Sequence, residues 1–146
     1  MIVTFCGHGD IFYSNETQKL LYSCIEELIH NGANEFFLGG YGSFDILAAK
    51  TVHELKQKYS NISSVLIIPY INREYNLDLY DSTIYPPLEK VPPRYAISKR
   101  NEWMVENADI IIAFTKYSFG GAVTTLNYAK RKKKRIIQLY NDSLEI

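Results

Sequence analysis

The chain has 146 residues, of which 47% are hydrophobic and 22% charged, a composition typical of one globular domain and not of a disordered chain or a disulfide scaffold. Sixteen Lys and Arg residues balance sixteen Asp and Glu residues, so no net charge draws the whole domain onto nucleic acid or an anionic membrane. No stretch approaches the roughly eighteen apolar residues of a membrane span, and no basic leader precedes the first apolar run. We therefore expect a single cytoplasmic domain over residues 1–146.

Short apolar runs alternate along the chain with segments of helical periodicity. The runs that predict buried strands are residues 2–5, 36–38, 65–68, 110–114 and 136–139. Helical spacing covers residues 15–31, 44–59, 98–107 and the stretch after Gly121. This alternation predicts an α/β domain of the Rossmann-like type, in three layers, with about five parallel strands and helices on both faces. Ligands of such domains bind beyond the carboxyl ends of the strands.

Residues 70–96 interrupt the regular pattern as a long loop rich in tyrosine and proline. A connection of this length inside a compact domain usually has a function or is disordered. Because the loop leaves the carboxyl end of the third strand, it can fold over the ligand crevice and offer tyrosine rings to a base. A packed surface loop or a dimer contact fits the sequence equally well.

Three strand ends lead into glycine-rich or polar turns, at residues 6–10, 39–45 and 118–124. Glycine allows a phosphate to approach the backbone closely, and the helix that follows offers free N–H groups with partial positive charge. We therefore predict an anion site where the turns converge. Hydroxyl donors at these turns are Ser43, Ser118, Thr124 and Thr125, and Asp45 is expected to cap its helix or to bind a ribose hydroxyl.

Other polar residues carry weaker indications. His8 stands between two glycines and is predicted to donate to a phosphate or to stack on a base. Cys6 and Cys24 lack metal-ligand spacing and are predicted to be reduced thiols, and we predict no metal. The basic run 130–135 can contact nucleic acid, but a solvated helix end is the favoured interpretation.

Four segments together resemble the SLOG superfamily (SMF/DprA-LOG), and most of all its small, stand-alone YoqJ-like branch of bacteria and phages. They are residues 3–8, 39–45, 99–109 and 120–129. The resemblance implies a Rossmann-like domain that binds nucleotides or nucleotide-derived molecules at these turns, as a sensor or as an enzyme that cuts an N-glycosidic bond. It also implies a homodimer or higher homo-oligomer and a role in phage or bacterial defence signalling.

The turns and the resemblance together assign the ligand contacts. These are Gly7, His8, Gly39, Gly40, Tyr41, Gly42, Ser43, Asp45, Arg100, Asn101, Ser118, Gly120, Gly121 and Thr124. An arginine at the position of Arg100 can hold a phosphate through two parallel hydrogen bonds. The chain departs from the pattern at Gly9, where an arginine often follows the histidine, and at Ala122, where threonine is usual.

Catalysis is the point on which the chain departs most from its resemblance. The LOG branch and the similar deoxyribosyltransferases carry a glutamate after the last glycine turn, whereas residues 124–127 contain no acid. Cleavage of an N-glycoside needs a carboxylate. Asp45 and Glu102, and also Asp10, are the weak substitutes, and no catalytic residue is assigned.

The favoured function is therefore binding of a nucleotide-derived small molecule, such as an ADP-ribose-like or nucleoside phosphate, by a sensor or sequestering protein without a cofactor. The alternative is a nucleotide N-glycosidase or phosphoribohydrolase. A third interpretation, a nucleic-acid-binding module centred on residues 130–135, is disfavoured because those cations suit a helix end.

Overall fold

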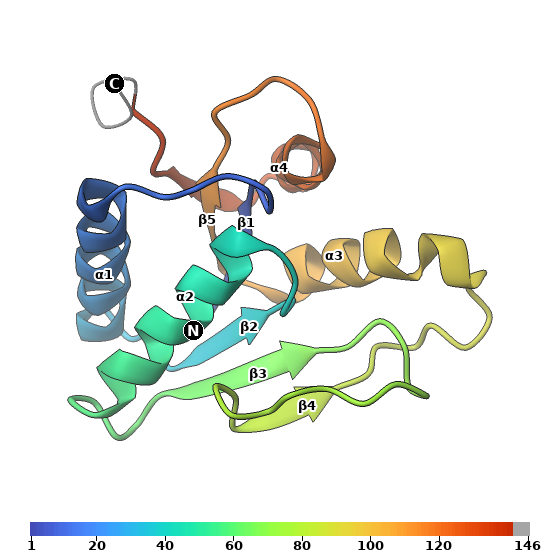
Figure 1. Cartoon of the computed structure of the whole chain (residues 1–146), viewed down its shortest axis with the longest axis horizontal. Coiled ribbons are helices and arrows are strands. Elements are labelled where there is room, and N and C mark those ends of the chain that lie inside the picture. Colours follow the sequence, from blue (N-terminus) through green and yellow to red (C-terminus); the bar gives the residue numbers. More distant parts are fainter. Residues whose placement is uncertain (142–146) are drawn as a thin grey trace.

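Six parallel strands and four α-helices make up the computed structural model, which describes residues 1–141 (Figure 1). The strands are β1 (Ile2–Gly7), β2 (Glu35–Leu38), β3 (Ser63–Ile67), β4 (Ser82–Ile84), β5 (Ile110–Phe114) and β6 (Arg135–Gln138). The helices are α1 (Asn15–His30), α2 (Ser43–Lys56), α3 (Ala96–Asn107) and α4 (Gly121–Arg131), and a short 3₁₀ turn, η1 (Pro93–Tyr95), precedes α3. The predicted α/β class is confirmed, with six strands instead of about five.

The winding direction of the chain reverses at the middle of the sheet. From edge to edge the strand order is β4-β3-β2-β1-β5-β6, and every pair is parallel. The chain proceeds outward from β1 to β4 and then returns through α3 to β5, on the other side of β1. Gly7 at the end of β1 pairs with Phe114 at the end of β5. A crevice forms beyond the carboxyl ends of two such strands, and open α/β sheets bind their ligands there.

Pairs of helices cover the two faces of the sheet. α1 packs beside α2 on one face, and α3 packs beside α4 on the other (Figure 1). Fully buried side chains such as Leu21, Ile25 and Val52 join the first pair to the sheet. Val105 and Leu126 fill the opposite face. Across residues 1–141, no helix combines the length and the apolar character needed to cross a membrane.

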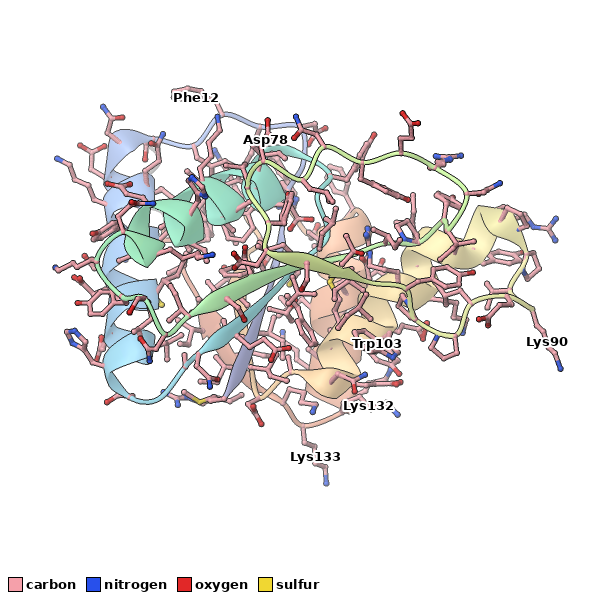
Figure 2. All side chains as sticks on the ribbon, turned by 90° about the horizontal axis from the view of Figure 1, so that it is seen from below. Phe12, Asp78, Lys90, Trp103, Lys132 and Lys133 are labelled. Carbon is pink, nitrogen blue, oxygen red and sulfur yellow. The ribbon has the colours of Figure 1, made fainter. Side chains whose placement is uncertain are left out.

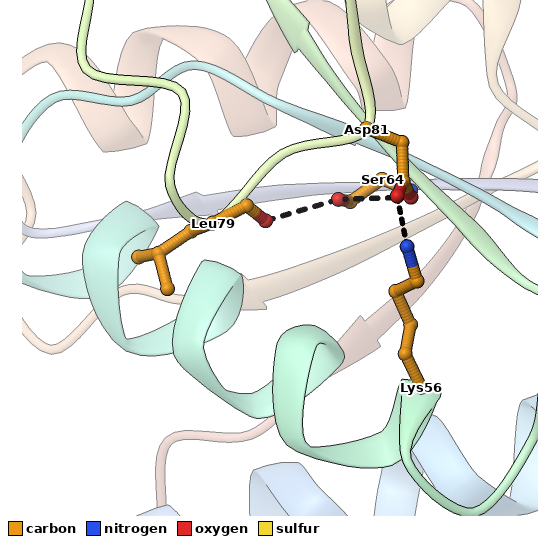
Figure 3. A network of polar contacts seen from close by, with 4 residues as sticks. All are labelled: Lys56, Ser64, Leu79 and Asp81. Atoms are coloured by element: carbon orange, nitrogen blue, oxygen red, sulfur yellow. Dashed lines mark hydrogen bonds and ion pairs between the residues drawn. The ribbon is translucent and has the colours of Figure 1, made fainter.

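The sixth strand, β4, lies within residues 70–96, which the sequence pattern describes as one loop. It extends the sheet beside β3 and is held by a carboxylate. Asp81 accepts a hydrogen bond from the Ser64 amide at 2.8 Å and forms an ion pair with Lys56 of α2, while the Ser64 hydroxyl donates to the carbonyl of Leu79 at 3.1 Å (Figure 3). Two of the three side chains of β4 are exposed. Without an apolar pattern, so short a strand cannot be predicted from the sequence.

Candidate functional site

A cavity of about 660 Å³ opens at the carboxyl ends of β1 and β5. Its walls are the turn after β1, Tyr41 from the turn after β2, one side of α3, and the turn that leads from β5 into α4. This is the crevice that the strand order creates. Its volume lies within the range of roughly 300–1,000 Å³ that is typical of small-molecule sites.

Arg100 of α3 is the most deeply buried charged group of this cavity, with 3% of its surface exposed. Its Nη1 donates to the carbonyls of Gly39 and Ile67 at 2.9 and 2.8 Å, and its Nε donates to Asn101 Oδ1 at 2.9 Å. Within residues 1–141, Nη2 has no hydrogen-bond acceptor, and it is not among the fully buried side-chain nitrogens. Arg100 itself lines the cavity. An anion in the cavity would supply the partner that this nitrogen lacks.

Asp45, in the first turn of α2, approaches the same point as Arg100. A Cβ atom at Gly39 would lie 2.7 Å from Asp45 Oδ2 and 3.3 Å from Arg100 Nη2. Burial raises the pKa of Asp45 to about 6, although the charge of Arg100 and a hydrogen bond from the Tyr41 amide lower it. The cavity therefore holds one permanent positive charge beside a carboxyl group whose charge changes near neutral pH.

The first turn of α4 presents free amides to the cavity. Gly120 caps the helix with a φ of 103°, and no side chain accepts a hydrogen bond from the helix there. Gly121 and Ala122 line the cavity, and their amides meet no acceptor in the part of the chain that the structure describes. Such amides carry partial positive charge and are suited to a phosphate. Together with Arg100, they make two separate groups that favour an anion in one cavity.

His8 fixes the backbone of the turn before α4. Its Nε2 accepts hydrogen bonds from the amides of Lys116 and Tyr117 at 2.9 and 3.1 Å. A ring nitrogen accepts only when it carries no proton, so His8 is neutral and its proton is on Nδ1. Burial lowers the pKa of His8, which favours this neutral form, although Asp10 raises the pKa. His8 lines the cavity and at the same time has this structural role.

The structure brings eight of the predicted ligand residues together around the cavity. They are Gly7, His8, Tyr41, Asp45, Arg100, Asn101, Gly120 and Gly121. Thr125 lines the cavity as well, whereas its neighbour Thr124 does not.

The remaining predicted ligand residues lie outside the cavity lining. They are Gly39, Gly40, Gly42, Ser43, Ser118 and Thr124. The Ser43 hydroxyl donates to the carbonyl of Ile11 at 2.7 Å, and the Thr124 hydroxyl donates to the carbonyl of Gly120 at 3.2 Å. Glu102, one of the weak catalytic candidates, is also outside and forms an ion pair with Lys99 at 3.3 Å. These polar groups are directed at the protein's own backbone or at solvent.

Several apolar and aromatic residues of the cavity were not predicted from the sequence. They are Cys6, Ile97, Met104, Tyr117 and Phe119. Burial raises the pKa of Cys6 to about 12, so its thiol stays protonated. Tyr117 and Phe119 could have been identified from the sequence, because aromatic residues in a glycine turn after a strand have little core to enter.

The tyrosine-rich segment does not reach this cavity. None of its tyrosines contributes to the lining; Tyr75 and Tyr80 instead border a second, smaller cavity of about 370 Å³ beside Gly40 and Leu66. Tyr75 donates to the carbonyl of Tyr70 at 3.0 Å, which closes the loop on itself. The described part of the loop therefore contributes no residue to the lining of this cavity, and its tyrosine rings do not border the space where a base would lie.

The basic run 130–135 lies around the end of α4 and the start of β6, whereas the cavity adjoins the first turn of α4. Lys134 donates to the carbonyls of Glu106 and Ala108, at 3.0 and 2.9 Å, and thus caps the end of α3. Lys133 has a positive φ of 56° and projects away from the molecule (Figure 2). At least one cation of the run is therefore structural.

Taken together, these features define the class of the protein: a Rossmann-like α/β domain with a small-molecule cavity at the reversal point of its sheet. The chain belongs to the family described as the YspA SLOG family (YpsA), whose pattern matches residues 14–141. It is 30% identical over 137 residues to YoqJ, a protein of the SPbeta prophage of Bacillus subtilis (strain 168), and the match covers 76% of this chain and 78% of that protein. The predicted resemblance to SLOG proteins is confirmed.

Solved structures support the fold at lower identity. The molybdenum cofactor binding protein of Rippkaea orientalis has a TM-score of 0.66 at 21% identity, with 98% of this chain and 78% of that one covered. DNA processing protein A (DprA) of Streptococcus pneumoniae has a TM-score of 0.68 at 15% identity, and this chain covers 51% of it. Another DprA, from Helicobacter pylori, is a protein with a single-stranded DNA binding mode. It has a TM-score of 0.66 at 15% identity, and the match covers 94% of this chain and 64% of that one. The fold of this chain is thus shared by proteins that differ in their ligands.

Proposed function

We propose that the protein binds a nucleotide or nucleotide-derived small molecule in the cavity between β1 and β5, as a sensor or sequestering protein. One observation carries the proposal: the buried Arg100, whose Nη2 has no acceptor among residues 1–141, and an uncapped helix N-terminus line the same cavity. Both groups favour a phosphate. The Rippkaea orientalis protein binds the molybdenum cofactor and the Helicobacter pylori DprA binds single-stranded DNA, and both agree with a binding function for this chain.

Arg100 is the first residue to test. Titration calorimetry with AMP and ADP-ribose should detect binding by the unmodified protein and at least a tenfold weaker affinity for Arg100→Lys, because lysine keeps the charge but loses the planar fork. Arg94→Lys makes the same change at an exposed arginine on η1, outside the cavity, and should bind like the unmodified protein. Equal affinity for all three proteins would contradict the proposal.

A second variant avoids damage to the buried contacts of Arg100. Ala122→Asp places a carboxylate in the first turn of α4, where a negative charge favours the helix by about 0.3–1 kcal/mol. Because Ala122 lines the cavity, the new carboxylate would occupy the place of the ligand's phosphate. We expect an unchanged or higher melting temperature and loss of AMP binding. Retained binding would place the anion elsewhere.

Asp45 supports a second candidate function, hydrolysis of an N-glycosidic bond. A carboxyl group with a pKa of about 6 in the cavity can steady positive charge that develops on a ribose ring, or position a water molecule. Incubation with nucleoside monophosphates and chromatographic detection of free base distinguishes the two functions. Base release that disappears in Asp45→Asn would favour the enzyme, and a thermal shift without release would favour binding.

A further inference from the structure

Three aromatic rings at the mouth of the cavity are unusually exposed. Tyr41 is 79% exposed, Phe119 is 71% exposed and Tyr117 is 43% exposed, yet all three line the same cavity. They come from two different turns, the one after β2 and the one after β5. Large apolar rings gathered in the open around a concave polar site indicate a surface that a ligand covers.

Two rings on the turn after β5 stack on each other, and a third ring, from the turn after β1, lies against them; we call the three an aromatic column. The ring of Phe119 lies 5.7 Å from that of Tyr117 with an angle of 24° between the two planes, and the ring of His8 lies 5.0 Å from that of Tyr117 at a tilt of 49°. His8 fixes the start of the column because its Nε2 holds the amides of Lys116 and Tyr117. Phe119, at the other end, is held against Tyr117 and remains mostly exposed.

We propose that the planar heterocycle of the ligand stacks on Phe119 and becomes the next ring of this column. The inference rests on the proposed function and deepens it, since it assigns the two parts of one molecule to two parts of the cavity. The phosphate lies at the Gly121 and Ala122 amides, with Arg100 as a further anion-binding group of the same cavity, and the base lies on Phe119. The ligand class is therefore a nucleobase that is joined to a phosphate through a sugar, and not a sugar phosphate alone.

Phe119 and the free amides at the start of α4 are close together in the chain, which suits this assignment. Phe119 directly precedes Gly120, which caps α4, so the ring and the free amides stand on one short, fixed turn. The tyrosines of residues 70–96 are not needed, because they lie outside the cavity. Stacking accepts any base, since every base has a flat aromatic face. The geometry thus predicts a preference for a base over none, and only a weak preference among bases.

The experiment compares ligands with and without a base. Titration calorimetry uses AMP, GMP, CMP and UMP on one side and ribose 5-phosphate on the other. The unmodified protein should bind each nucleotide at least tenfold more tightly than ribose 5-phosphate. Phe119→Leu should weaken nucleotide binding by roughly fivefold to a hundredfold, the range for loss of one base–aromatic stack, and leave ribose 5-phosphate unchanged. Phe119→Trp should retain the nucleotide affinity.

Phe12 supplies the matched control. It is 85% exposed on the loop between β1 and α1, projects from the surface, and does not line the cavity (Figure 2). Phe12→Leu should therefore leave every affinity unchanged. Nucleotides that bind no better than ribose 5-phosphate, or an equal loss for both ligand types in Phe119→Leu, would overturn the stacking inference alone. Absence of binding by all five compounds would overturn the proposed function and the inference with it.

Discussion

Two glycine turns of the molecule have almost the same backbone but opposite surroundings. Gly42 before α2 has φ and ψ of 91° and 162°, and Gly120 before α4 has 103° and 175°, and neither helix has a side-chain cap. In the turn before α2, the Ser43 amide donates to the carbonyl of Gly9 at 2.9 Å. In the turn before α4, the amide of Gly121 meets no acceptor within residues 1–141. At the first helical amide, the turn before α2 is therefore closed by the protein itself and the turn before α4 is open, and we call them the closed and the open turn in this sense.

The comparison teaches that a glycine turn by itself does not reveal an anion site. A strand, glycines and a helix occur in both places, and both turns have the conformation that a phosphate site needs. The difference arises from a third segment, the turn after β1, whose backbone at Gly9 packs against Gly42. Among the described residues, a Cβ at Gly120 would meet nothing within 4 Å. Four experiments can break or sharpen this distinction.

The largest effect is expected from alanine at the two capping glycines. Both positions have positive φ values in a region that is nearly exclusive to glycine, so each substitution costs about 1–3 kcal/mol in strain. At Gly42 the new Cβ would also lie 2.7 Å from Gly9 Cα, whereas at Gly120 it would meet nothing within 4 Å. Gly42→Ala should therefore lose clearly more unfolding free energy than Gly120→Ala in urea denaturation. Equal losses would show that the closed turn can yield.

Asp45 belongs to the closed turn and tests its electrostatic cost. The pKa of Asp45 in the folded protein, about 6, lies above the ordinary value of 3.8, so folding favours the protonated carboxyl group. The folded protein therefore loses stability as the pH rises from about 4 to 6. Asp45→Asn removes this loss and should raise the unfolding free energy at pH 7 by up to about 3 kcal/mol. The gain should vanish at pH 4. A loss of stability at pH 7 would contradict the burial of this carboxylate.

His8 tests how firmly the open turn is held. Its pKa is lowered in the folded state, so the stability it contributes is present above the ordinary value of 6.5 and is lost as the pH falls through the folded pKa. The slope can reach about 1.4 kcal/mol per pH unit. In His8→Gln the amide oxygen can still accept from Lys116 and Tyr117 but does not titrate.

The measurement is urea denaturation between pH 5 and 8, with an NMR titration of the histidine rings. The titratable groups around His8 are Asp10, Lys116 and Tyr117, and their contributions should remain in His8→Gln. The unmodified protein should therefore lose more stability below pH 6.5 than the variant. The same pH dependence in both proteins would remove His8 from this role.

The smallest changes in stability are expected from two alanine variants, Ser43→Ala and Gly121→Ala, one of which should affect only folding and the other mainly binding. Ser43→Ala removes hydrogen bonds to the carbonyls of Ile11 and His8, at 2.7 and 3.2 Å, and should cost about 1 kcal/mol without changing AMP affinity. Gly121→Ala meets no atom within 4 Å and should gain up to about 1 kcal/mol in helix propensity. Its methyl group stands in the cavity, so AMP affinity should fall at least tenfold. Calorimetry and denaturation of both variants check the contrast.

Apolar periodicity was sufficient to predict most of the fold. Uniformly apolar runs such as 110–114 predict central strands because buried parallel strands have no polar face. β4 was missed because its stability comes from a contact far away in the sequence, between Asp81 and Ser64. Local spacing carries no information on such a contact.

The sequence identified a residue of the candidate site where the residue type and its position in the pattern both indicated contact with a ligand. Arg100 was identified because the SLOG resemblance places an arginine at this position and an arginine can hold a phosphate through two hydrogen bonds, and the structure places it in the cavity. Ser43 was not distinguishable from a ligand residue, because its hydroxyl finds an acceptor in a different turn. The aromatic column was missed because it depends on the spatial order of His8, Tyr117 and Phe119.

The carboxylate that holds β4 also sets how far the sheet can grow. Asp81 satisfies the Ser64 amide with its side chain, so the outer ladder consists of only three residues, Ser82–Ile84, two of them exposed and polar. A foreign strand that docked there would gain few main-chain hydrogen bonds, and short polar edges of this kind protect against edge-to-edge aggregation. The Lys56–Asp81 pair thus fixes, on the side of α2, the residue that precedes this short edge strand.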